Sequence, residues 1–147
     1  MPFTKQDIHE IAESQREFFL SGKTLDIKFR KEQLLKLKKA ILDNQKELEK
    51  ALHEDLGRSE CEAYFCDIGD TVMEINEYYE GVAAWAKPER HFSGLAAFPS
   101  LTTKVYPMPY GVSLIISPFN FPILLSLGVL AAAICGGNTA IDRKSVV

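Results

Sequence analysis

The chain has 147 residues, of which 46% are hydrophobic and 25% charged, and its net charge at pH 7 is −3. This length suffices for one domain with a buried core, and the composition is that of an ordinary globular protein. No basic cluster with interleaved aromatic residues is present, which argues against a nucleic-acid partner. The charge is uneven, since Lys104 is the only charged residue between His91 and Asp142. The second part of the chain therefore lies in a protein core or in a membrane.

Three cysteines, Cys61, Cys66 and Cys135, show no paired spacing. The sequence therefore predicts free thiols and a reducing compartment, the cytoplasm. Cys61 and Cys66 have no histidine placed to complete a metal site, so no metal is expected. The N-terminal stretch "MPFTKQDIHEIAES" has no apolar run after its first charges, and no signal peptide is expected.

The charge-rich first part, residues 1–90, predicts three helices. The first runs from about Thr4, its N-cap, to Phe19. The second runs from about Ile27 to Leu56 and stops at glycine. The third begins at Ser59, where "SECE" forms a capping box, and ends before Pro88. A coiled coil of the last two is an alternative, but the aromatic content favours packing onto a globular body.

The remainder predicts a hairpin and a βαβ unit. Residues 91–102 show no period and predict a linker, and residues 103–111 predict an edge strand or hairpin arm, because Pro107 and Pro109 exclude a central strand. An apolar run at 111–117 predicts a strand buried on both faces of a parallel sheet. A helix over 123–135, a glycine stop and a strand at 139–141 complete the unit.

The predicted fold class is thus α/β. A helical N-terminal segment (1–90) is followed by a linker and edge strand (91–110). The last part (111–147) is the first βαβ of a Rossmann-like, doubly wound nucleotide-binding domain.

The alternative is a helical interaction module anchored in a membrane by its apolar C-terminal third, because residues 109–141 carry no charge. Pro118 and Pro122 oppose this, since each removes a backbone donor and disfavours helix before it. Only thirteen residues separate Pro122 from Gly136. That is too few to span a hydrocarbon layer of about 30 Å.

The loop "SPFNFP" (117–122) places a polar amide, Asn120, between the predicted strand and helix. Open α/β sheets bind ligands just beyond the carboxyl ends of their strands. There is no GxGxxG motif, so a nucleotide would not use that phosphate loop. Asn120 is also a good candidate N-cap of the following helix, and the residues alone favour the cap.

The stretch "PYGVSLIISPFNFPILLSLGVLAAAICGGNTAI" resembles the start of the cofactor domain of NAD(P)-dependent aldehyde dehydrogenases. That family has Pro-x-Gly-Val, an apolar strand, Pro-Trp-Asn-Phe/Tyr-Pro, an apolar helix and Ala-Gly-Asn. The upstream "DLGRSECEAYFCDIG" and "WAKP" resemble the class-3-like branch. Its members act on fatty and aromatic aldehydes and are usually dimeric. The resemblance covers nearly the whole chain.

The resemblance implies oxidation of an aldehyde with NAD or NADP. It assigns Asn120 as the donor to the substrate oxyanion, and this motif match reverses the preference for the helix cap. It places Ile116, Ser117 and Phe119 at the cofactor, with Phe119 where the family has tryptophan. Arg143 takes the place of the lysine that binds the adenosine ribose.

The resemblance also implies that the nucleophilic cysteine and the glutamate base belong to segments downstream of these residues. The ending "DRKSVV" departs from the family's Lys-Pro-Ser-Glu, so a truncated chain that is inactive alone is expected. Cys135 is interpreted as a buried structural thiol. His9, His53 and His91 are interpreted as surface or structural residues.

Overall fold

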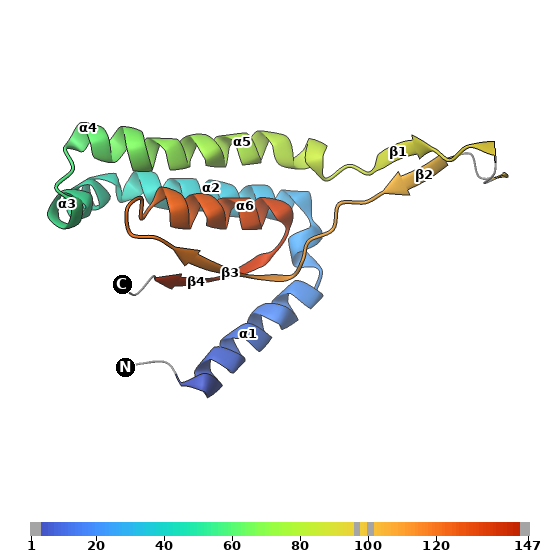
Figure 1. The fold of residues 1–147 in the computed structure, drawn as a ribbon, viewed down its shortest axis with the longest axis horizontal. Helices are drawn as coiled ribbons and strands as arrows, with labels where there is room; N and C mark the ends of the chain where they lie inside the picture. Colours follow the sequence, from blue (N-terminus) through green and yellow to red (C-terminus); the bar gives the residue numbers. More distant parts are fainter. Residues whose placement is uncertain (1–3, 96–97, 100–101, 145–147) are drawn as a thin grey trace.

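The structure is a computed structural model, which describes residues 4–95, 98–99 and 102–144 (Figure 1). Its helices are α1 (Lys5–Leu20), α2 (Ile27–Asp43), α3 (Gln45–Leu56), α4 (Glu60–Ala63), α5 (Gly69–Trp85) and α6 (Val129–Gly136). A 3-10 turn spans Lys23–Leu25, and π-helical turns span Tyr64–Ile68 and Leu124–Gly128. The strands are β1 (Glu89–Phe92), β2 (Thr102–Val105), β3 (Val112–Ser117) and β4 (Thr139–Lys144).

Both predicted N-terminal caps are confirmed. The Thr4 hydroxyl accepts from the amide of Asp7, whose carboxylate accepts in turn from the amide of Thr4. Ser59 and Glu62 form the same reciprocal capping box at the start of α4. These hydrogen bonds lower the pKa values of Asp7 and Glu62, because they stabilise the charged carboxylates.

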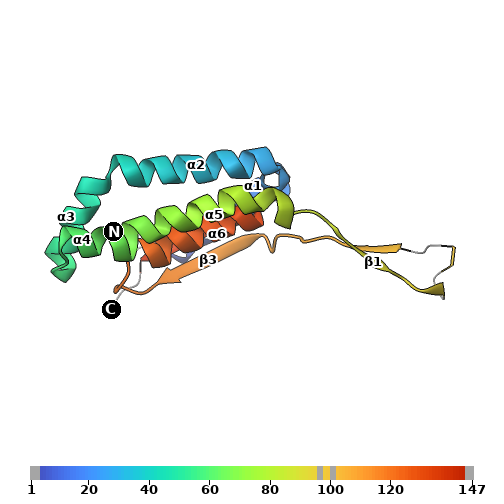
Figure 2. The ribbon, with the colours of Figure 1, turned by 90° about the horizontal axis from the view of Figure 1, so that it is seen from above.

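The prediction of one helix over Ile27–Leu56 is wrong, because the helix breaks at Asn44. The backbone of Asn44 leaves the helical region at φ −105°, and its side-chain amide donates to the carbonyl of Ala40 at 2.8 Å. Such a local bond offers the backbone an alternative to continued helix. The break allows α3 to turn towards α4 at the end of α2 (Figure 2).

The third predicted helix forms as α4, a π-helical turn and α5 in direct succession. The turn inserts a wider loop of backbone at Tyr64–Ile68, and it contains two buried residues, Asp67 and Ile68. The apolar face continues through Ile75 and Val82 of α5, which are also buried. A π-helical turn inside an α-helix often lies at a functional site.

The predicted edge strand is present as β2, which ends before Pro107 and pairs antiparallel with β1. The linker expected from residue 91 is wrong at its start, because Glu89–Phe92 forms β1. Within that linker, residues 96–97 and 100–101 lie outside the described part of the chain. The hairpin extends away from the helices (Figures 1 and 2). All residues of both strands are exposed. An exposed pair of strands gains no burial, so no apolar period marked β1 in the sequence.

The predicted βαβ unit is confirmed. Strands β3 and β4 pair in parallel, from Val112 opposite Thr139 to Ser117 opposite Lys144, and α6 lies between them in the chain. Gly137 ends α6 in the left-handed conformation at φ 83°, as the glycine stop predicts.

The prediction that β3 is buried on both faces is wrong. Ile115 and Ser117 are buried, but Leu114 and Ile116 are 62% and 64% exposed. Helix α6 lies over one face of the two strands, and α1 approaches the other (Figure 1). A hydrogen bond links α1 to the start of β4, from the Thr139 hydroxyl to the Gln15 carbonyl. The far ends of the strands on that face remain uncovered.

One apolar core joins the helical segment to the βαβ unit. Its buried members are Leu34, Ile41, Leu52, Ala63, Ile68, Ile75, Ile123 and Ala131. Helices α2 and α5 both contact α6, so they pack onto a globular body rather than onto each other alone. The three-part division into 1–90, 91–110 and 111–147 stays a prediction. In the described ranges, no helix combines the length and apolar character that crossing a membrane requires.

Candidate functional site: the loop after the first parallel strand

The loop between β3 and the π-helical turn holds the candidate site. β3 ends at Ser117 and the next helical backbone begins at Leu124, so Pro118 and Pro122 both lie in irregular structure. The two prolines keep either element from running through the loop. Asn120 is exposed at the middle of this loop, beyond the carboxyl end of a parallel strand.

The N-cap interpretation of Asn120 is wrong. The residue before the helical backbone is Ile123, and its side chain makes no capping bond. The first amides are satisfied instead by Asp67, whose Oδ1 accepts from the amide of Ile123 at 3.1 Å and of Leu124 at 2.6 Å. No hydrogen bond to the Asn120 side chain occurs among the described residues. Its amide is therefore available to a ligand.

Asp67 is a buried carboxylate, with a side chain 0% exposed. Burial raises its pKa, because the charged form loses hydration, and this outweighs the opposite effects of the Leu124 amide and of Arg58. Its charge lies at the N-terminus of a helix, where a negative group is favoured by the helix dipole.

Arg58 connects Asp67 to the loop. Its Nη1 donates to Oδ2 of Asp67 at 2.9 Å, and its Nη2 donates to the backbone carbonyl of Asn120 at 2.5 Å. The guanidinium carbon also lies 4.6 Å from the centre of the Phe121 ring. The Arg58 side chain is 14% exposed. One side chain thus holds both the loop and the carboxylate that caps the next helix.

The residues predicted to bind the cofactor differ in their exposure and in their hydrogen bonds. Ile116 and Phe119 are each 64% exposed. Ser117 is buried at 8% exposed, and its hydroxyl donates to the carbonyl of Leu125 at 3.0 Å, so it is engaged within the protein. The backbone of Arg143 pairs with Ile116 across the two strands, while its side chain lies outside what the structure describes.

A cavity of about 570 Å³ lies beside this loop. It is lined by α3, by the loop and the turn that follows, and by Asp142 of β4, and its loop residues include Ser117, Pro118 and Phe119. It therefore lies at the carboxyl edge of the parallel strands, where open α/β sheets bind their ligands.

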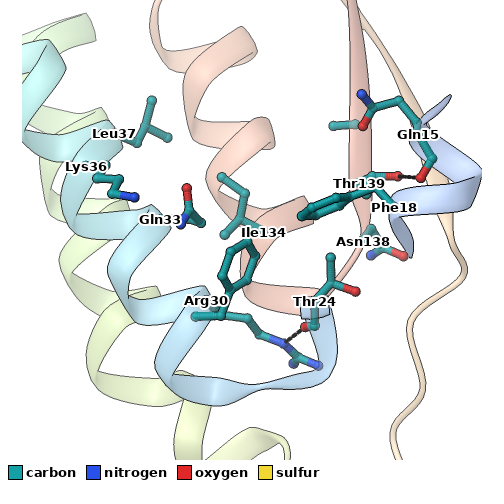
Figure 3. A pocket seen from close by; sticks show the side chains of 12 residues that line it. Gln15, Phe18, Thr24, Arg30, Gln33, Lys36, Leu37, Ile134, Asn138 and Thr139 are labelled. Carbon is teal, nitrogen blue, oxygen red and sulfur yellow. Dashed lines mark hydrogen bonds between the residues drawn. The ribbon is translucent and has the colours of Figure 1, made fainter. Parts of the chain in front are cut away.

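A second cavity, of about 460 Å³, lies where β4 begins and α6 ends, among α1, α2 and Asn138 (Figure 3). Arg30 is buried at its wall, and its guanidinium donates to the carbonyls of Thr24 at 2.6 Å and Cys135 at 3.1 Å. Burial lowers the pKa of Arg30. The arginine closes the end of α6 onto the helical segment.

Cys135 is confirmed as a buried thiol. Its Sγ lies 3.9 Å from the carbonyl of Tyr78, and burial raises its pKa, which disfavours the reactive thiolate. Cys61 and Cys66 are exposed and free. The histidines His9, His53 and His91 lie at the surface. A cluster of three potential metal ligands does not occur in the part of the chain that the structure describes.

The sequence patterns did not predict roles for Asp67, Arg58 or Arg30. One signal was available for Asp67: it lies four residues from Ala63 and from Thr71, which are both buried, so it interrupts an apolar helical stripe. A carboxylate at such a position requires hydrogen-bond partners. Arg30 similarly precedes buried Leu34 by one helical turn. No local pattern indicated that Arg58 would reach Asn120, 62 residues away.

The fold is that of an α/β protein, with an exposed asparagine and a cavity beyond the carboxyl end of a parallel strand. The aldehyde dehydrogenase family model matches residues 2–145. The chain is 42% identical over 132 residues to 4,4'-diaponeurosporen-aldehyde dehydrogenase of Staphylococcus aureus, covering 88% of this chain and 28% of that protein. It is 34% identical over 145 residues to aldehyde dehydrogenase family 3 member F1 of Arabidopsis thaliana, covering 99% and 30%.

The solved structure of the substrate-bound state of Staphylococcus aureus AldH superposes with a TM-score of 0.88 at 38% identity. That match covers 99% of this chain and 31% of the other. The chain therefore belongs to the aldehyde dehydrogenase family, as the loop motif predicted. It spans under a third of the length of these relatives.

Proposed function

We propose that the protein acts in the NAD(P)-dependent oxidation of an aldehyde to a carboxylic acid, with Asn120 as the donor to the substrate oxygen. One observation carries the role of Asn120. Its side chain is exposed beyond the carboxyl end of β3, while Asp67 takes over the capping of the helix. The side-chain amide of Asn120 is thus not needed to cap the helix, and Asn120 lies at the asparagine position of the family's motif.

The chemistry of Asn120 follows from where charge develops. When a nucleophile adds to an aldehyde, the carbonyl oxygen gains negative charge, and a fixed amide donor stabilises that charge more than the neutral carbonyl. The loop's two prolines and its two hydrogen-bonded anchors, Arg58 and Asp67, restrict where this donor lies. Such preorganisation is what makes an oxyanion donor effective.

Among these residues, Cys135 does not fit the role of nucleophile, because it is buried and its pKa is raised. The resemblance places the nucleophilic cysteine and the glutamate base in other segments of the family. We therefore expect residues 1–147 alone to lack dehydrogenase activity.

The residues at the loop fit a dinucleotide in their chemistry. Ile116 and Phe119 present exposed apolar surface at the carboxyl edge of the strand, which suits an aromatic ring of a cofactor. When bound, NAD or NADP supplies the acceptor for the hydride. Ser117 would contact it through backbone or Cβ, since its hydroxyl already donates to Leu125. Arg143 is proposed to reach the adenosine ribose.

The substrate, assembly and location are proposed from the class-3-like branch. We expect fatty or aromatic aldehydes as substrates and a homodimer in the cytoplasm. The exposed hairpin β1–β2 supports the dimer, because in the described part of the chain its two strands form a sheet of their own, and an exposed sheet edge can pair with a strand of a second copy. The membrane-anchored module is not favoured, since no described helix is long and apolar enough to span a bilayer.

Replacement of Asn120 by alanine tests the proposal. The whole protein in these tests is residues 1–147 joined to the family's segments that carry the nucleophilic cysteine and the glutamate base. We expect kcat to fall by about 10²–10³-fold, as when an oxyanion donor is removed, while the KM for the cofactor stays the same. Activity is measured by NAD(P)H formation with aliphatic and aromatic aldehydes. Lys39→Met is a matched control, because it removes an exposed cation whose ion-pair partner is Asp43 rather than a residue of the loop.

Two results would contradict the proposal in different ways. If the unaltered protein forms no NAD(P)H with any of these aldehydes, the assigned activity is wrong. If it is active and Asn120→Ala keeps its kcat, the activity stands and the role of Asn120 is wrong.

A further inference from the structure

We propose that Arg58 and Asp67 are positioning residues for Asn120, which together fix the backbone from which its amide reaches the substrate oxygen. This inference rests on the proposed function, because it needs Asn120 to act as the oxyanion donor. Neither residue would touch the substrate. They act by holding the loop on both sides of the asparagine.

The contacts form one connected chain. Arg58 donates to the carbonyl of Asn120 itself at 2.5 Å, so it holds the peptide unit between Asn120 and Phe121. Its other arm donates to Asp67 at 2.9 Å, and Asp67 accepts the amides of Ile123 and Leu124. The loop is therefore tied at Asn120 and again three and four residues later.

The anchor of this chain is itself rigid. Asp67 is buried in the helical run from α4 to α5, beside the buried Ile68 of the core. The backbone of Arg58 is held as well, because its carbonyl lies 2.8 Å from Nδ1 of His53, in the last turn of α3. The ring of Phe121 adds a third support, with the guanidinium carbon 4.6 Å from its centre. Motion of the loop thus requires several contacts to break together.

The geometry needs an arginine rather than any cation. The guanidinium is planar and directs separate N–H groups to two acceptors in a fixed arrangement, whereas an ammonium is a compact point charge on a flexible stem. Lysine at position 58 would keep its ion pair with Asp67. It would not hold the Asn120 carbonyl in the same geometry, and it would lose the contact of the guanidinium with the Phe121 ring.

The expected consequence is catalytic rather than structural. A donor displaced by a fraction of an ångström loses part of its advantage for the transition state, while substrate and cofactor binding depend little on it. We therefore expect Arg58→Lys to lower kcat by about tenfold. The KM values and the unfolding midpoint should stay near those of the unaltered protein.

A double-mutant cycle with Asn120→Ala tests the inference, using purified whole protein and steady-state kinetics. Because Arg58 is proposed to act through Asn120, Arg58→Lys should change kcat much less when Asn120 is already alanine. An equal loss of kcat in both backgrounds would overturn the positioning role. Lys39→Met serves as the control and should leave kcat unchanged in both backgrounds.

A second variant covers the case in which Arg58→Lys folds poorly. Asp67→Asn keeps an oxygen for the two helix amides but turns an NH₂ group towards Arg58, which also donates. It should lower kcat and show the same dependence on Asn120, with amide exchange at Ile123 and Leu124 increased. If Asp67→Asn keeps full kcat and the exchange is unchanged, the inference is wrong. If the unaltered protein itself shows no activity, the proposed function is wrong.

Discussion

The helical run after the candidate loop, residues 124–136, is held by an arginine at each end, and the two ends differ in what they hold. At the front, Arg58 and Asp67 bind the exposed loop and the first amides of the run. At the back, Arg30 binds the carbonyl of Cys135 and the carbonyl of Thr24. Both ends suit the helix dipole, since a carboxylate lies at the N-terminus and a cation at the C-terminus.

The difference lies in solvent and in partners. Arg30 is buried, and among the described residues its side chain donates only to backbone carbonyls, so it closes the fold. Arg58 is 14% exposed, and one of its acceptors belongs to the residue proposed to meet the substrate. We therefore expect changes at the back to affect stability, and changes at the front to affect catalysis beyond any effect on stability.

The largest expected effect is that of Arg30→Met. The methionine fills part of the volume but leaves the carbonyls of Thr24 and Cys135 without their donor. Each buried acceptor that loses its partner costs about 1–3 kcal/mol, partly offset because a buried cation is also removed, so we expect a loss of about 2–4 kcal/mol. Urea unfolding of the whole protein measures it, with Lys39→Met as control. An unchanged unfolding midpoint would show that the back end is not held by Arg30.

A smaller effect is expected from Gly137→Ala, compared with Gly57→Ala. Both glycines end helices with positive φ, at 83° and 69°, so alanine costs about 1 kcal/mol at each. A Cβ at Gly137 would overlap the guanidinium of Arg30, whereas Gly57 has open space around it. The guanidinium is hydrogen-bonded and cannot move away freely. Gly137→Ala should therefore cost about 1 kcal/mol more than Gly57→Ala.

Urea unfolding of the two glycine variants in parallel gives the comparison. Equal losses would mean that Arg30 shifts at no cost and that the back end is looser than its hydrogen bonds indicate. Combining Gly137→Ala with Arg30→Met sharpens the test. The extra loss should then disappear, because the overlapping group is gone.

The sequence predicted the fold where a local pattern had a single physical meaning. The N-cap at Thr4, the capping box at Ser59, the glycine stop after α6 and a strand over the apolar run at 111–117 each occurred as expected. The sequence-based prediction was wrong where tertiary packing or a weak local preference determined the structure. Asn44 breaks a leucine-rich run by one side-chain bond, and β1 forms from exposed residues without an apolar period. The open face of β3 depends on what covers it, which β3 itself does not encode.

The candidate site shows the same boundary. The resemblance of the loop motif to the family assigned Asn120 its role, which stays a prediction, whereas the residues alone favoured a helix cap. The motif did not indicate Asp67, which lies 56 residues from its partner Ile123. Only the packing of α5 and the Tyr64–Ile68 turn against the Leu124–Gly128 turn brings the Asp67 carboxylate to the start of the helix. From the residues alone, the nearby Asn120 is therefore favoured as the cap. A polar residue inside an apolar stripe was the one available sign.

The smallest expected effect distinguishes the two ends by pH. Burial raises the pKa of Asp67 above the ordinary value of 3.8. At pH values between the ordinary pKa and the raised pKa of the folded protein, the folded protein binds more protons than the unfolded chain. The free energy of unfolding therefore falls as the pH rises through this range. Asparagine at position 67 does not titrate. The stability of the unaltered protein relative to Asp67→Asn should therefore increase as the pH is lowered through the same range.

The matching measurement at the back end should be flat. The guanidinium of Arg30 stays protonated at every working pH, so the difference between the unaltered protein and Arg30→Met should not change in that acidic range. Urea unfolding of the three proteins from neutral pH down to about pH 4, where carboxylates begin to titrate, gives both curves. If the Asp67→Asn difference decreased in acid, the contacts of Asp67 with Arg58 and the two amides would outweigh its burial. The front end would then be held mainly by charge, and the assignment of burial as the dominant influence on Asp67 would be wrong.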